Sequence, residues 1–282
     1  MRENGTDLLK ALATAGLVLA AAVAHAQAAH AQGDGSKVAA VYKLRMAGLE
    51  LATFHFGSAV TGGVYTLNGH GALSWGFGLF KYNGNFTSSG RIVGEAIQPA
   101  AYAYDWKVNK KAGAVRIAYT GAAVKSVALT PPHTPSPDAV PLKPEHLRSV
   151  FDPLTALIVL SRRGAGEPCD RRIAVFEGKQ RFDIAFSPLR TERVQEAKPT
   201  GHPVTAYVCR VKYTPVAGHK LNRETQAAVK AEGIEVALRA VPSAGVLVPY
   251  RVLLPTPLGN AVLTAQKVDI TLPGNRVIAL TH

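Results

Sequence analysis

The run Val41-Tyr-Lys-Leu-Arg-Met-Ala-Gly48 decides the fold that we expect for this chain. Lys43 and Arg45 alternate with apolar neighbours, which is the period of two of a half-buried β-strand. Gly48 permits a bend, the alternation resumes up to Phe56, and the cluster Thr61-Gly62-Gly63 suits a hairpin turn. The run therefore predicts neighbouring strands joined by tight turns.

The same alternation recurs along most of the chain, up to about residue 130 and again from about residue 172 to 271. Roughly a dozen such runs, against one or two short helices, predict a mostly β protein. We expect a single curled antiparallel sheet or an open β-barrel-like domain. Some glycines should mark kinks in a strongly curved sheet, where a side chain would collide: Gly69, Gly71, Gly76 and Gly78.

Two short helices and one proline-rich segment interrupt the strand pattern. Asp152 is a good N-cap and Pro153 suits the first turn, so we expect a helix over about residues 153–161 that plugs a groove or barrel mouth in the sheet. A polar second helix is expected within residues 222–233. Residues 131–144 hold six prolines and predict an extended strap across one domain, with a linker between two domains as the alternative.

Residues 1–26 have the organisation of an export signal. An apolar run over residues 11–23 precedes Ala24-His25-Ala26, a small-x-small cleavage pattern that Ala29-His30-Ala31 repeats. The run is shorter than a typical membrane span, and no Cys near the cut offers a site for lipid attachment. We therefore expect residues 27–282 to form one β-rich periplasmic domain without a transmembrane span or lipid anchor. A short membrane anchor or an amphipathic helix is the alternative.

The chain of 282 residues holds 32 Lys and Arg against 19 Asp and Glu, a net charge of +13. In the cytoplasm this charge would favour nucleic acid as a partner, but export excludes that partner. In a cell envelope, the anionic surfaces are lipid head groups and wall polymers, and a positive field speeds encounter with them. A solvated basic surface without a partner is the alternative.

Cys169 and Cys209 are the two cysteines of the chain. An even count in an exported protein is typical of a disulfide. Two free buried thiols are one alternative. A metal site with His202 and His219 is another, although such a site normally needs four ligands.

The sequence contains no recognisable catalytic motif. The run Gly71-Ala-Leu-Ser-Trp-Gly76 has the wrong spacing for a nucleophile elbow, and no glycine-rich loop is followed by Lys-Ser or Lys-Thr. The histidines lack the spacings of metal ligands. We therefore expect no catalytic residues, no metal site and no cofactor.

Four residues are candidates for binding a polar ligand. Arg181 and Asp183 share one face of a predicted strand and can bind a polar group or form salt bridges. Arg91 has the same two interpretations. Tyr102 belongs to a group of aromatic residues that can line an apolar cavity or form an ordinary core.

Several short motifs occur in order along the chain: Tyr42-x-Leu-x-x-x-Gly48, Ser89-Gly-Arg91, Asp152-Pro-Leu, Cys169, Phe176-x-Gly-Lys-x-Arg-Phe-Asp183, Cys209-x-Val-x-Tyr213 and Pro249-Tyr-Arg251. Together they resemble the exported bacterial family called domain of unknown function 3108, over about residues 38–272. The resemblance implies a periplasmic protein with a curled β-sheet and one disulfide. It implies no activity and no catalytic residues.

We therefore expect a non-enzymatic periplasmic protein of the cell envelope, whose concave sheet face binds a lipid, a wall polymer or an envelope protein. The alternative is a hydrolase or transferase acting on envelope components, with Asp183, Arg181 and a His brought together from distant strands. A purely structural part of an envelope assembly is a third hypothesis.

Overall fold

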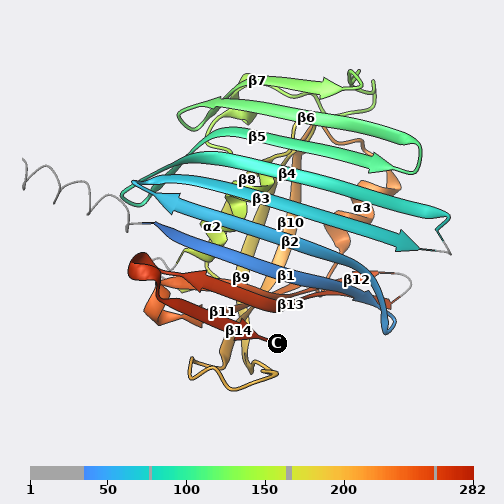
Figure 1. Ribbon diagram of the computed structural model, residues 1–282. Coiled ribbons are helices and arrows are strands. Elements are labelled where there is room, and N and C mark those ends of the chain that lie inside the picture. The colour runs from blue at the N-terminus through green and yellow to red at the C-terminus, as the bar shows by residue number, and fades with distance from the viewer. Residues whose placement is uncertain (1–34, 76–77, 163–166, 257–258) are drawn as a thin grey trace, which may run out of the picture.

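The computed structural model describes residues 35–75, 78–162, 167–256 and 259–282 of the chain. Fourteen strands form one antiparallel sheet that curls back on itself without closing into a barrel (Figure 1). This confirms the expected mostly β fold with a curled antiparallel sheet. The expected export signal, residues 1–26, lies outside the described residues, as does Gly76.

The first seven strands follow one another in a meander that fills the front of Figure 1: β1 (Ser36–Met46), β2 (Leu49–Thr61), β3 (Val64–Trp75), β4 (Phe80–Val93), β5 (Ala96–Val108), β6 (Lys111–Thr120) and β7 (Ala123–Thr130). The second half of the chain supplies the others: β8 (Arg171–Phe176), β9 (Arg181–Arg193), β10 (Thr205–Ala217), β11 (Glu235–Val241), β12 (Val246–Thr256), β13 (Gly259–Thr271) and β14 (Val277–Thr281). Strand β13 pairs with β1, so the last part of the chain continues the sheet that the first part begins.

A short segment before the first helix bridges the seam between the two outermost strands of the sheet, β7 and β8. The Val150 amide donates to the carbonyl of Ala122 at 3.3 Å, just before β7. On the other side, the Phe151 amide donates to the carbonyl of Ala174 at 2.9 Å, and the Phe176 amide donates to the carbonyl of Phe151 at 2.9 Å. The segment therefore holds the two ends of the curl together.

Helix α2 (Pro153–Ser161) packs inside the curl, against β4, β5, β8 and β12. Its N-cap is Asp152, whose Oδ1 accepts the amides of Leu154 and Thr155 at 3.1 and 2.9 Å. At the other end, the Arg171 guanidinium donates to two carbonyls of the last turn, which lack partners within the helix. The helix spans the residues that the sequence predicts.

A second short helix, α3 (Arg223–Lys230), is inserted between β10 and β11, and Asn222 caps it by accepting the Thr225 amide at 2.9 Å. The proline-rich residues 131–144 run from β7 to the end of β10, where the Val140 amide donates to the carbonyl of His219 at 2.9 Å. The segment thus joins two parts of one sheet. Three single turns are 3₁₀-helical: η1 (Pro144–Leu147), η2 (Pro242–Ala244) and η3 (Pro273–Asn275).

Three clusters of buried apolar side chains form the core. The first lies between α2 and β8–β12, the second between α2 and β5–β6, and the third joins β10–β12 to β1, β13 and β14. Cys169 and Cys209 lie in the first cluster and form a disulfide with 5.2 Å between their Cα atoms. This confirms the predicted bridge. No helix of the described chain is long and apolar enough to cross a membrane.

Aromatic rings lie against glycines of the neighbouring strands. A Cβ at Gly71 would lie 2.3 Å from the ring of Phe54, and one at Gly69 would lie 3.0 Å from the ring of Phe56. Real Cβ atoms do not approach another atom as closely as a Cβ at Gly71 would approach Phe54. A glycine is therefore needed at this position, where the sequence predicted a kink. Gly78 differs from that prediction: its φ is +86°, and it belongs to the turn before β4.

Candidate ligand-binding groove

Two rows of side chains, short except for Arg116, cross β3–β7 on the face of the sheet opposite the core. Within each row, side chains on consecutive strands stand directly opposite one another, and all are exposed or half-buried. One row is Asn68, Thr87, Ala103, Arg116 and Ala128; the other is Thr66, Ser89, Ala101, Ala118 and Ser126. Together they line an open groove of about 650 Å³. Four inter-strand steps of about 4.8 Å give each row a length of about 19 Å.

Two arginines give the groove positive charge. Arg116 donates through Nη2 to Oδ1 of Asp105 at 2.6 Å, so its charge is partly neutralised. Arg91 lies two residues beyond Ser89 on β4, and therefore on the same face, one row outside the groove. It is exposed and forms no ion pair with any described residue. Arg91 is thus the free cation at the border of the described groove.

Tyr102 lies in the row of residues between the two rows that line the groove. The side chains of this middle row point to the opposite face of the sheet. It is buried in the core cluster with Val115 and Ile117, and burial raises the pKa of its phenol. Its backbone, rather than its hydroxyl, therefore forms the floor of the groove. Of the two interpretations open from sequence, the structure places Tyr102 in the core.

Beneath the groove, the buried carboxylate of Asp152 gathers polar side chains from the sheet and α2. Its Oδ2 accepts the hydroxyls of Ser88 at 3.1 Å and of Thr155 at 2.5 Å. Because Thr155 donates to the carboxylate, the Tyr65 hydroxyl donates to Thr155 Oγ1, at 2.9 Å. Burial raises the pKa of Asp152, against the opposing effect of these hydrogen bonds. All four groups are buried, so they fasten α2 to β3 and β4 and do not face the groove.

Arg181 and Asp183 lie on β9, away from the groove, and form an ion triad with β8. The carboxylate of Asp183 is 2.7 Å from Nη1 of Arg181 and 2.6 Å from Nη2 of Arg172. Among the described residues, no histidine contacts Asp183. The structure therefore favours the salt-bridge interpretation of this pair, and it does not bring the pair together with Arg91 or Tyr102.

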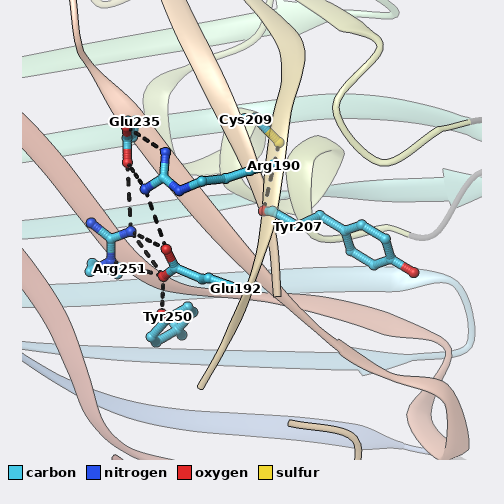
Figure 2. A network of polar contacts seen from close by, with 7 residues as sticks. All are labelled: Arg190, Glu192, Tyr207, Cys209, Glu235, Tyr250 and Arg251. Carbon is cyan, nitrogen blue, oxygen red and sulfur yellow. Dashed lines mark hydrogen bonds and ion pairs between the residues drawn. The ribbon is translucent and has the colours of Figure 1, made fainter. Parts of the chain in front are cut away.

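A second charged network joins β9, β11 and β12 (Figure 2). Arg190 forms a two-pronged pair with Glu235, at 2.8 and 2.7 Å, and Arg251 binds Glu192 at 2.8 Å. The Tyr250 hydroxyl also donates to Glu192. Partial burial acts to raise the pKa of Glu192, but the hydrogen bonds from Tyr250 and Arg251 hold it below its ordinary value. Two arginines and two carboxylates neutralise one another, which is typical of a structural network.

A bulge makes this network possible. In the pairing of β11 with β12, Ala237 opposes Arg251 while Leu238 opposes Pro249, so Tyr250 is an extra residue in β12. Such a bulge re-aims side chains, and here both Tyr250 and Arg251 reach Glu192. No pattern in the sequence predicted these residues as a site, although the motif Pro249-Tyr-Arg251 contains two of them.

A fully buried arginine, Arg239, fastens the β9–β10 loop to the end of the chain. It binds Glu196, donates to the carbonyl of Pro203 at 3.0 Å, and donates to the ring of His282 at 3.1 Å. Burial and the nearby Arg239 lower the pKa of His282 to about 4, which keeps its ring neutral and able to accept. All three guanidinium nitrogens of Arg239 have protein partners, so the cluster is structural.

Comparisons with known proteins add a family and no activity. The family model described as "Protein of unknown function (DUF3108)" matches residues 41–266. No curated protein matches the chain. A crystal structure of a DUF1329 family protein from Desulfovibrio piger shows 9% identity over 88% of this chain and 83% of that chain, with a TM-score of 0.17. A TM-score this low carries no argument about the fold or the site.

Proposed function

The chain belongs to the DUF3108 family of proteins of unknown function, and from its geometry we propose a non-enzymatic periplasmic protein of the cell envelope that binds an anionic wall polymer along the groove. The single observation that carries this proposal is the groove itself, open and about 650 Å³ in volume, with Arg91 free at its border. Export rests on residues 1–26, and the Cys169–Cys209 disulfide is consistent with an oxidising compartment.

The lining of the groove combines hydroxyl and amide groups with apolar surface. Hydroxyl and amide groups of Thr66, Thr87, Ser89, Ser126 and Asn68 offer both donors and acceptors along it. The alanines between them leave room for a chain to lie flat against the sheet. An exposed arginine at the border adds recognition of an anionic group, because guanidinium binds carboxylate and phosphate oxygens.

The concave face, which the sequence analysis expected to bind a partner, is packed against α2 where the helix crosses it. Buried side chains of α2 fill the space between β4–β5 and β8–β12. We therefore assign the ligand to the opposite face. The carboxylate of Asp183 forms ion pairs with two guanidiniums, and no histidine among the described residues contacts it. These contacts favour binding over hydrolysis or transfer.

Co-sedimentation with purified murein sacculi tests the proposal. Ala101→Trp fills the centre of the groove from an exposed position, and Arg91→Ala removes its free cation. Both should weaken binding, Arg91→Ala by about tenfold for one charge-assisted contact. Arg193→Ala and Thr191→Trp, exposed on β9, are the matched controls and should bind like the wild type. Wild-type protein that stays in the supernatant, or controls that bind as weakly as the groove variants, would contradict the proposal.

A further inference from the structure

One end of the sheet collects the turns between alternate strands. In the meander, the β1–β2, β3–β4 and β5–β6 turns fall at this end, on the right of Figure 1. The start of β13 joins them, because Ala261 pairs with Met46 at the end of β1. Neighbouring turns are tied together: the Asn109 amide donates to the carbonyl of Lys81 at 2.9 Å, and the Lys81 amide donates to Asn109 Oδ1 at 2.8 Å. We call this surface the turn end.

Large apolar side chains project from the turn end into solvent. Leu79 is 83% exposed and Leu49 is 64% exposed, and each lies beside a turn. Phe80 and Leu254 are exposed at the same end. The opposite end, with the β2–β3 and β4–β5 turns, presents the smaller Val64, Val93 and Val277. These leucine and phenylalanine side chains add exposed apolar surface to the turn end.

Positive charge accompanies these apolar groups. Residues 43–52, 78–84 and 105–113 of the turn end contain six Lys or Arg against two acidic residues. The matching segments of the opposite end, 58–67, 90–97 and 118–125, contain two against one. Four exposed lysines of the turn end form no ion pair with any residue that the structure describes: Lys81, Lys107, Lys110 and Lys111.

We propose that the turn end docks on the surface of an anionic lipid bilayer. Leucine and phenylalanine side chains at its tips enter the boundary between head groups and acyl chains, while the lysines meet anionic head groups. A bilayer surface fits both kinds of side chain at the turn end, the apolar ones and the lysines. A wall polymer offers no apolar phase for the leucines, and a second copy of the same basic end would bring like charges together.

Docking in this way sets the orientation of the molecule. The strands that carry the turns would stand on the membrane, and the groove, which crosses them, would run parallel to its surface. Arg116 lies five residue steps after Lys111 on β6, a rise of about 17 Å. The groove would thus lie about 17 Å from the turns, clear of the head groups. Docking does not depend on what fills the groove.

Flotation with extruded vesicles tests the docking. Wild-type protein should bind vesicles of phosphatidylcholine with 30% phosphatidylglycerol and bind vesicles of pure phosphatidylcholine far less. Leu49→Ser/Leu79→Ser should lower the partition coefficient at least about tenfold. Lys110→Gln/Lys111→Gln should lower it about fivefold per lysine, and only on the anionic vesicles. These positions are exposed, so the variants should fold, which circular dichroism checks.

Matched controls come from the opposite end. Val64→Ser/Val93→Ser and Lys37→Gln/Lys125→Gln remove the same kinds of groups and should leave flotation unchanged. The proposal is overturned if wild-type protein does not float with the anionic vesicles, or if the controls lose as much as the turn-end variants. Sedimentation velocity would also overturn it if Leu49→Ser/Leu79→Ser dissolved a dimer, since a second copy would then cover this end. Arg91→Ala should leave flotation intact, so failure of the groove and failure of docking are distinguishable.

Discussion

At the scale of residues, Asp152 joins three parts of the chain through one carboxylate. It caps α2, holds the hydroxyl of Ser88 on β4, and through Thr155 reaches Tyr65 on β3. Its position as a cap follows from local sequence, since Asp before Pro is a strong helix start. Its contacts with β3 and β4 do not, because residues 64 and 87 positions away meet only in the folded sheet.

Replacement of Asp152 should separate its capping from its charge. Asp152→Ala removes the cap, which costs about 1 kcal/mol, and leaves buried hydroxyls without an acceptor, which costs about 1–3 kcal/mol more. Asp152→Asn keeps a cap acceptor and should lie within about 1 kcal/mol of the wild type at neutral pH. Urea unfolding of the three proteins measures both values, and equal losses in the two variants would contradict this account.

The pH dependence follows from the raised pKa of Asp152. The folded protein holds this proton more tightly than the unfolded chain does, so the group contributes most below its ordinary pKa of about 4. That contribution is lost as pH rises through the folded-state pKa. As pH rises from about 4 to 7, the free energy of unfolding of the Asp152→Asn variant should therefore increase relative to that of the wild type. A difference that does not change with pH would show that the folded-state pKa is ordinary.

At the scale of elements, some glycines allow contacts between neighbouring strands that a Cβ would exclude. A Cβ at Gly90 on β4 would lie 2.3 Å from the backbone carbonyl oxygen of Gln98 and 2.4 Å from the hydroxyl of Tyr65. The carbonyl cannot move without breaking the pairing of β4 with β5. Gly94, in the next turn, has a φ of +59° and open space around it.

These two glycines make a matched pair for mutation. Gly90→Ala should cost about 3 kcal/mol or more, because the backbone of β5 and the ring of Tyr65 must both shift. Gly94→Ala should cost about 1–2 kcal/mol, from its left-handed backbone alone. Thermal or urea unfolding compares the two, and a larger loss at Gly94 would mean that β4 and β5 are not packed as described.

At the scale of the whole molecule, one segment joins the two ends of the curl and one disulfide fastens nearby strands. The segment at Val150 and Phe151 bridges β7 and β8 by backbone hydrogen bonds, and the Cys169–Cys209 disulfide fastens the entry to β8 onto β10. The sequence separation of the cysteines is 40 residues. In the chain-entropy view, closing such a loop restricts the unfolded chain and stabilises the folded state by up to about 4 kcal/mol.

Loss of the disulfide should weaken the whole sheet. Cys169→Ala/Cys209→Ala should lower the free energy of unfolding by about 2–4 kcal/mol, and each single variant should lose nearly as much as the double one. Dithiothreitol should lower the stability of the wild type by a similar amount and leave the double variant unaffected. A wild type that is indifferent to the reductant would contradict a stabilising bridge.

Local sequence was sufficient for much of the fold. Alternation before and after Gly48 predicted β1 and β2, Asp152-Pro153 predicted the start of α2, and two cysteines in a chain with an expected export signal predicted their pairing. Each of these features depends on neighbours in sequence or on a simple count. The candidate groove residues were harder: Arg91 lies at the border, Tyr102 lies in the core beneath, and Arg181 and Asp183 lie elsewhere.

Sequence by itself thus determined which residues form strands, which residue caps α2 and which cysteines can bond, because short-range geometry controls those features. Only the tertiary structure decided which side chains share a row across five strands and which turns share an end. A shift of one residue in register would turn the groove residues into the core, and the bulge at Tyr250 alone re-aims the network around Glu192. Register and bulges depend on strand partners far away in sequence, so the groove and the turn end are visible only in the folded sheet.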